Sequence, residues 1–428
     1  MVGGGAAGVA TAVTAARQGV KVILLERYGF CGGGAVAGLS GTICGRYTAS
    51  DDPTANPQRV VHGFLDEFIQ VMNDKGGLTT AVRYGKTWTH VHDPFVWRDS
   101  ADYLLDQAAV QVLFHAIVTE VLLDGDRVEG VIANTKQGKV RIDAKVTVDA
   151  SGDADVCAMA GFPTTSGGKD GTVQNPTMMF RISNVDTREF LRTYGDDSIM
   201  SESVMKLIRQ LNESKQYKLP RTKVFFFPTP HPNELLCNVT RVIGRDGREL
   251  NPLNARDLTE AEIEGRLQVR EYERFIKDYM VGCSRAFVND TGVQVGVRQS
   301  RQIEGVTKLL NDDVVAGRKR SDGIARSAWP IEFHSGEKPK LVWLMDDYYE
   351  IPYTCFVPRA GEGILAAGRC LSAENEAMAS ARVTAQCFAY GHAVGHAAAL
   401  AFKESMAPRA IKGEDIRDLL NLDGAELE

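Results

Sequence analysis

The chain opens with a glycine-rich turn, a helix of small residues and an uninterrupted apolar run. MVGGGAAG leads into VATAVTAARQG, where Gly19 is placed to end a helix. VKVILLE follows, an apolar stretch typical of a strand covered on both faces. This order predicts a nucleotide-binding unit, although only Met1 and Val2 are left for its first strand. We expect residues upstream of Met1 to complete that strand, the alternative being a shortened one.

Alternating positions predict three strands in the middle of the chain. IVTEVLL, RVEGVIAN and KVRI are separated by polar turns between Ile117 and Ala150. A plain NAD-binding half would have a helix at this crossover. Near the C-terminus, GILAAG predicts a short buried strand, and a helix rich in small residues is expected from about Ala379 to Lys403.

A second region differs in pattern. TKVFFFPTPHPNELLCNVTRV is rich in aromatic and β-branched residues and predicts strands. A helix should follow, opened by a capping box at Thr259 and Glu262. We therefore predict an α/β protein: a Rossmann-like domain with a β-meander crossover, and an inserted α+β cap or substrate domain. The first domain would comprise 1–50, 85–165 and 345–428, and the cap 51–84 and 166–344.

Composition restricts the function. The 428 residues are 44% hydrophobic and 24% charged, with a net charge of −6, which suits a globular protein with a large core and gives no support for nucleic-acid binding. No apolar run approaches the roughly 20 residues of a membrane span, and no signal peptide is visible. The eight cysteines never form C-x-x-C, which argues against a zinc or iron–sulfur site. We expect a cytoplasmic protein without a metal.

The glycine motif becomes informative in this context. Gly3, Gly5 and Gly8 fit G-x-G-x-x-G, and Glu26 ends the next strand, where a carboxylate can accept hydrogen bonds from ribose. A second cluster at Gly32 and Gly33 could bring backbone N–H groups to a long cofactor. Dinucleotide binding is therefore predicted.

Over nearly its whole length the chain resembles FAD-dependent oxidoreductases with a glutathione-reductase-type FAD domain. The resemblance rests on the motifs above and on DASGD at 149–153, GR at 368–369, VGVRQSRQIEG, YEIPYTCFVPR and ASARVTAQCFAYGHAVGHAAAL. It implies FAD as the cofactor. The residues it implies for FAD binding are Gly3, Gly5, Ala6, Ala7, Gly8, Glu26, Arg27, Gly32, Gly33, Val118, Ala150, Gly152, Gly368, Arg369 and Ala379. The helix near Ala379 would direct its positive end at the flavin.

Arginines are the first candidates for substrate chemistry. Arg298 and Arg301 offer planar donor forks that suit a carboxylate. On a strand their spacing would place them on opposite faces, so one could bind substrate and the other protein. An interdomain salt bridge is the alternative for both. Asn238 and Thr240 would share one face of a strand, as a cavity wall or a solvent face.

The proton acceptor stays open. His231 lies in a Pro-rich loop of the cap, while Glu374 and Glu376 precede the helix expected to face the flavin. His392 and His396 are four residues apart, but without an evident third ligand we favour packing over a metal site.

Cys31 and Cys44 are too far apart for the dithiol motif of disulfide reductases. Either could carry a covalent flavin, but small buried residues are the simpler interpretation.

We predict hydride transfer from a small organic substrate to flavin N5, with an unknown electron acceptor. The alternatives are a flavin-dependent reductase of an activated double bond, or an electron-transferring FAD subunit. A homo-oligomer is left open.

Overall fold

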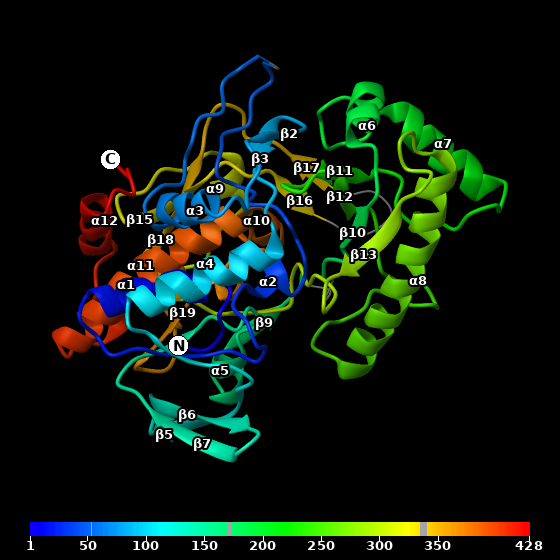
Figure 1. The fold of residues 1–428 in the computed structure, drawn as a ribbon. Coiled ribbons are helices and arrows are strands. Elements are labelled where there is room, and N and C mark those ends of the chain that lie inside the picture. The colour runs from blue at the N-terminus through cyan, green and yellow to red at the C-terminus, as the bar shows by residue number, and fades with distance from the viewer. Residues whose placement is uncertain (53, 169–172, 334–339) are drawn as a thin grey trace.

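The computed structural model describes residues 1–52, 54–168, 173–333 and 340–428. They form two lobes (Figure 1). The larger lobe contains both termini, and the smaller one is built around the long helix α8 (Ala255–Tyr279). Among the described residues, no helix has the length and apolar character needed to cross a bilayer.

A parallel sheet lies at the centre of the larger lobe. β1 (Ile23–Leu25) pairs with β4 (Gln111–Leu113), and β8 (Thr147–Asp149) pairs with β19 (Ile364–Ala366). Val2 joins the two pairs, because it forms parallel bridges with both Leu25 and Asp149. Its N–H donates to the Val148 carbonyl over 3.0 Å. The first strand is thus a single bridging residue, and the glycine turn and α1 (Ala6–Arg17) follow it in the predicted order.

Helices cover this sheet. α1 packs against α11 (Thr384–Lys403), where Gly391 lets the two backbones approach: a Cβ on it would lie 2.2 Å from the Ala7 carbonyl oxygen. α3 (Phe64–Asp74) and α4 (Pro94–Gln107) complete the layer, with the Phe68 ring 4.7 Å from that of Trp97.

Two parts of the predicted division need correction. The range 51–84 was assigned to the cap, yet the apolar face of α3 lies in the core of the larger lobe, with α1 and α11. Likewise β15 (Gly323–Ser327) pairs with β18 (Tyr349–Pro352) and packs against α11 and α12 (Gly413–Leu422), so this part of 166–344 also belongs to the larger lobe.

The predicted meander is present. β5 (Ile117–Asp124), β6 (Arg127–Thr135) and β7 (Gly138–Asp143) form an antiparallel three-stranded sheet. It lies at the lower end of the larger lobe in Figure 1.

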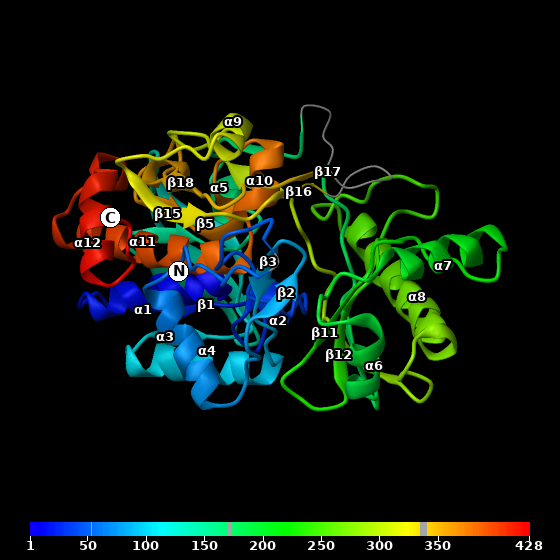
Figure 2. The same ribbon diagram turned by 90° about the horizontal axis from the view of Figure 1, so that it is seen from above.

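The cap sheet has the strand order β11–β12–β10–β13, and all its pairs are antiparallel. Its strands are β11 (Phe225–Pro228), β12 (Glu234–Asn238), β10 (Phe180–Ser183) and β13 (Phe287–Thr291). α6 (Thr187–Tyr194), α7 (Glu202–Glu213) and α8 lie alongside it (Figure 2).

Two predicted helix starts were wrong. α8 begins at Ala255, because the Asn254 side chain accepts hydrogen bonds from the N–H groups of Arg256 and Asp257; Thr259 lies inside the first turns. The C-terminal helix begins at Thr384 instead of near Ala379. Ala379 belongs to a separate helix, α10 (Asn375–Ala381), and the chain breaks between them.

The remaining elements are short. They are α2 (Gly33–Val36), β2 (Val82–Tyr84), β3 (Thr87–Thr89), α5 (Asp155–Met159), β9 (Thr164–Ser166), β14 (Arg301–Ile303), α9 (Asn311–Val315), β16 (Ile331–Phe333), β17 (Lys340–Val342), η1 (Tyr353–Phe356), η2 (Gly368–Cys370) and η3 (Pro408–Ala410). Both views place β2, β3, β16 and β17 on the side of the larger lobe that faces the cap (Figures 1 and 2).

Candidate active site

A cavity of about 340 Å³ extends from the glycine turn to the cap sheet. This volume lies at the lower end of the range for small-molecule sites. Its lining includes these predicted cofactor residues: Gly3, Gly5, Ala6, Ala7, Glu26, Arg27, Gly32, Gly33, Val118, Ala150, Gly152, Gly368 and Arg369. Residues spread over almost the whole sequence therefore meet at one cavity.

The glycine turn forms a backbone cradle at the start of α1. Gly3 has φ +99°, and a Cβ on it would lie 2.4 Å from the Ala150 carbonyl oxygen. Gly5 caps the helix without a side chain, and Ala6 and Ala7 also line the cavity. Gly8 does not line it. A Cβ on Gly8 would lie 1.9 Å from the Gly3 carbonyl oxygen, so Gly8 allows the helix to start this close to the turn.

Glu26 ends β1 with its carboxylate fixed. One oxygen accepts from Gly4 N–H over 2.7 Å, and the other from Tyr28 N–H over 2.9 Å. The side chain is buried yet reaches the cavity. Because carboxylate oxygens have further lone pairs, Glu26 can still accept from a ribose hydroxyl.

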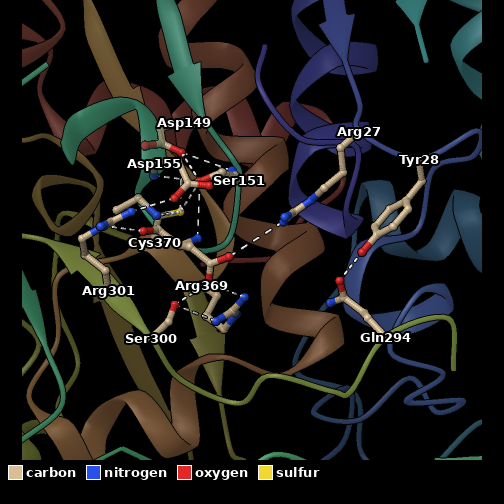
Figure 3. A network of polar contacts seen from close by, with 12 residues as sticks. Arg27, Tyr28, Asp149, Ser151, Asp155, Gln294, Ser300, Arg301, Arg369 and Cys370 are labelled. Carbon is tan, nitrogen blue, oxygen red and sulfur yellow. Dashed lines mark hydrogen bonds and ion pairs between the residues drawn. The ribbon is translucent and has the colours of Figure 1, made fainter. Parts of the chain in front are cut away.

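Asp153 connects two predicted cofactor residues, Arg27 and Arg369, which are both labelled in Figure 3. Its carboxylate lies 3.8 Å from the Arg27 guanidinium and 3.1 Å from that of Arg369. Burial alone would raise the pKa of Asp153, but Arg369, a hydrogen bond from Ser300 and Arg27 together hold that pKa below its usual value. The network fixes both arginines at the cavity edge.

Arg298 and Arg301 have different surroundings, but not because they alternate on one strand: only Arg301 lies on a strand, β14. Arg301 donates to the Asp153 carbonyl over 2.9 Å and to the Asp155 carboxylate over 2.7 Å (Figure 3). It does not line the cavity, and both of these contacts are with protein groups. Arg298 lines the cavity.

Three other predicted residues lie outside the lining. His231 is 55% exposed, with Nε2 2.6 Å from the Asp93 carboxylate. Glu374 occupies the N-cap position of α10, and its carboxylate accepts from Asn311 N–H over 2.7 Å. Ala379 is fully buried inside α10. The α11 start that reaches the cavity is marked instead by Val383 and Thr384.

Sequence reasoning missed the residues where the lobes meet. Tyr84, Phe227 and Trp329 form an aromatic wall, with the Tyr84 ring 5.9 Å from Phe227 and 5.3 Å from Trp329. Glu332 and Arg382 line the same region. The only sequence signal was a charged residue inside the apolar stretch WPIEF.

Asn238 lines the cavity, which agrees with the prediction of a cavity wall and not with the alternative of a solvent face. Thr240 does not, because its hydroxyl is engaged with the Met178 backbone at 2.9 Å in both directions.

Two arginines at this end are strongly desolvated. Burial, followed by repulsion from Arg221 and Arg382, lowers the pKa of Arg298 to about 9. Burial lowers the pKa of Arg382 to about 10, with Arg369 adding repulsion and Glu332 opposing the shift. Both guanidinium groups are still charged near pH 7, in an environment where charge is costly.

The cysteines at the cavity are thiols. Burial raises the pKa of Cys44 to about 11 and that of Cys387 to about 12. Cys31 is buried outside the lining. None has the low pKa of a nucleophilic cysteine.

His392 and His396 face a third polar group that the sequence did not reveal. Their Nε2 atoms lie 3.4 and 2.9 Å from one Asp423 carboxylate oxygen. Burial and the neighbouring His392 lower the pKa of His396 to about 4.

The geometry fits a dinucleotide. The start of α1 faces the cavity with no acidic residue in its first turn and no capping side chain, which leaves its N–H groups for an anion such as pyrophosphate. A family model described as FAD dependent oxidoreductase matches residues 1–420. The chain belongs to this family. FAD is its cofactor, and it is an oxidoreductase.

One solved structure supports the fold. A geranylgeranyl bacteriochlorophyll reductase-like protein from Thermoplasma acidophilum is 13% identical with a TM-score of 0.52, over 98% of this chain and 82% of that one. The p-nitrophenol 4-monooxygenase PnpA from Pseudomonas putida DLL-E4 is 12% identical with a TM-score of 0.47, over 100% and 85%. No protein of curated function matches this chain in sequence. The glutathione-reductase subtype stays a prediction.

Proposed function

We propose that this enzyme oxidises a small organic molecule bound between the lobes. The observation that carries the proposal is one continuous cavity, whose lining changes from glycine backbone to aromatic, arginine and carboxylate side chains. When bound, FAD accepts a hydride at N5. The aromatic wall would hold the substrate and exclude water, which favours a fixed orientation of the reacting carbon.

Glu332 is our candidate for the proton acceptor, in place of His231 and Glu374. It lines the cavity together with Arg298 and Arg382, whereas His231 and Glu374 do not line it. As a C–H bond breaks and its electron pair leaves as hydride, Glu332 would take the proton of the adjacent O–H or N–H group. A carbonyl or imine would result.

The test is anaerobic mixing of the FAD-loaded protein with a panel of small alcohols and amines, followed by visible absorption. Bleaching by a panel member would support the proposal. Glu332→Gln should then slow bleaching by about 100-fold, the lower end for general-base catalysis. Glu376→Gln, which alters a carboxylate paired with Lys340 outside the cavity, should bleach normally.

Other outcomes favour the alternatives. Reoxidation of the reduced protein by an activated alkene, without bleaching by any alcohol or amine, would favour the double-bond reductase. The reductase alternative depended partly on Arg298 and Arg301 binding substrate together. The hydrogen bond from Arg301 to Asp155 weakens this alternative, because it engages Arg301 with protein. Exchange of electrons only with a protein would favour the electron-transferring subunit.

A further inference from the structure

Positive charge gathers where the cavity meets the cap. Arg298 and Arg382 line the cavity there, and Arg221, which is outside the lining, donates to the side-chain oxygen of Asn238 over 2.7 Å. Electrostatic interactions couple all three guanidinium groups to one another or to Glu332. Within the described part of the chain, none of the three forms an ion pair with a carboxylate.

The donors of the two lining arginines are only partly used. Arg298 donates through Nη1, to the Asn175 carbonyl over 2.7 Å and to the Thr177 hydroxyl. Arg382 donates through Nη2 to the Gln174 side chain over 3.1 Å, while its buried Nε has no hydrogen-bond partner among the described residues. Buried charge without a counter-ion is destabilising, so the two lining arginines, with Arg221 close by, form a site that an anion would complete.

The surroundings restrict the anion. The adjacent wall is Tyr84, Phe227 and Trp329, all buried. A small inorganic anion would leave this wall uncovered, whereas a molecule with a flat apolar body and one carboxylate would cover it and reach the arginines.

We propose that Arg298 and Arg382 form the carboxylate subsite of the substrate pocket, and that the substrate is an apolar or aromatic monocarboxylic acid. This inference rests on the proposed function for the word substrate, but the binding site itself does not depend on turnover. The subsite would orient the substrate for oxidation, because the arginines would hold its carboxylate while the reacting carbon lies along the aromatic wall.

The experiment titrates the FAD-loaded protein with benzoate and, separately, with its neutral isostere benzamide. Binding is followed through the flavin absorption bands and through the melting temperature. We expect saturable binding of benzoate, with benzamide weaker by about tenfold or more, the size of one charge-assisted hydrogen bond. Equal affinities for benzoate and benzamide, or no binding of benzoate, would overturn the proposal. This outcome needs only the wild-type protein and no variant.

Variants then locate the site. Arg298→Met and Arg382→Met should each raise the Kd for benzoate by about tenfold or more, and Arg298→Lys should fall between, since it keeps the charge but not the fork. Arg359→Gln is the control, because Arg359 pairs with Glu304 and is 59% exposed. Unchanged affinity in both Met variants would also overturn the proposal, and a variant that loses FAD is replaced by its Lys counterpart.

The two proposals fail separately. Benzoate binding without bleaching by any alcohol or amine would leave the subsite standing and remove the oxidation. Bleaching by uncharged alcohols or amines, in a protein indifferent to benzoate, would leave the oxidation and remove the subsite.

Discussion

Gly5 and Gly33 hold the two glycine clusters against each other: a Cβ on Gly33 would lie 2.9 Å from the Gly5 Cα. Gly33 also has φ +47°, whereas its neighbour Gly34 has open space around the Cβ position and no positive φ. All three glycines line the cavity. The contact sets the position of the helix start that we expect to hold the pyrophosphate.

Gly33→Ala should therefore weaken FAD binding. The left-handed conformation costs roughly 1–2 kcal/mol for an L residue, so the Kd for FAD should rise by about tenfold or more. Gly125→Ala is the matched control, because Gly125 also has a positive φ of +60°, has open space around its Cβ position and does not line the cavity; it should bind FAD within about twofold of the wild type. The measurement is titration of the apoprotein with FAD. Equal affinities in the two variants would contradict the role of the contact.

Substitutions at Arg301 and at Arg298 should have different effects: the first should lower stability, and the second should weaken ligand binding. Arg301→Gln removes a partly buried bond to Asp155 and should lower the free energy of unfolding by about 1 kcal/mol. Its affinity for benzoate should match the wild type, because Arg301 does not line the cavity. Thermal denaturation and benzoate titration of this variant and of Arg298→Met give the comparison. A large loss of benzoate affinity in Arg301→Gln would show that the assignment of the two arginines is reversed.

The nucleotide end of the site was predictable because its signals are local. Gly3, Gly5 and Glu26 stand at spacings set by one turn, one helix and one strand, and all three line the cavity. A local signal also gave a wrong helix start. Thr259 was predicted to cap α8, but Asn254 is also a residue type that caps helices, and it is the Asn254 side chain that accepts from two N–H groups at the start of α8.

The substrate end was not predictable in the same way. Tyr84, Trp329 and Arg382 come from three separate segments, on β2, on the connection between β15 and β16, and on the break before α11. No spacing in the sequence relates them, since only the packing of the cap against the larger lobe brings them together. His231 and Glu374 were chosen by residue type, yet Asp93 and Asn311 engage them elsewhere.

Acid precipitation should release FAD from the protein. Of the two cysteines considered for a covalent flavin link, only Cys44 lines the cavity. Its pKa of about 11 leaves almost no thiolate at pH 7 to form such a link. We expect the flavin spectrum in the supernatant after precipitation, and an unchanged flavin content in Cys44→Ser. A yellow pellet from the wild type that becomes colourless in Cys44→Ser would contradict this.

Stability should fall as the solution is acidified below pH 6.5. His92 is buried against Trp97, and neither of its ring nitrogens has a hydrogen-bond partner among the described residues. Burial lowers its pKa to about 4, against opposing effects of Asp93 and with added repulsion from Arg181. Between pH 6.5 and 4 the unfolded chain holds a proton at His92 that the folded chain lacks, so the folded state loses up to about 1.4 kcal/mol per pH unit.

His92→Phe should remove this contribution. Phenylalanine fills a similar volume and does not titrate, so the decrease in melting temperature from pH 7.5 to pH 5 should be smaller than in the wild type. His396, whose pKa is also lowered to about 4, adds a similar slope that remains in the variant. His115→Gln is the control, because His115 is exposed. His115→Gln should keep the pH dependence of the wild type, and if His92→Phe kept it as well, His92 would bind its proton equally in the folded and the unfolded chain.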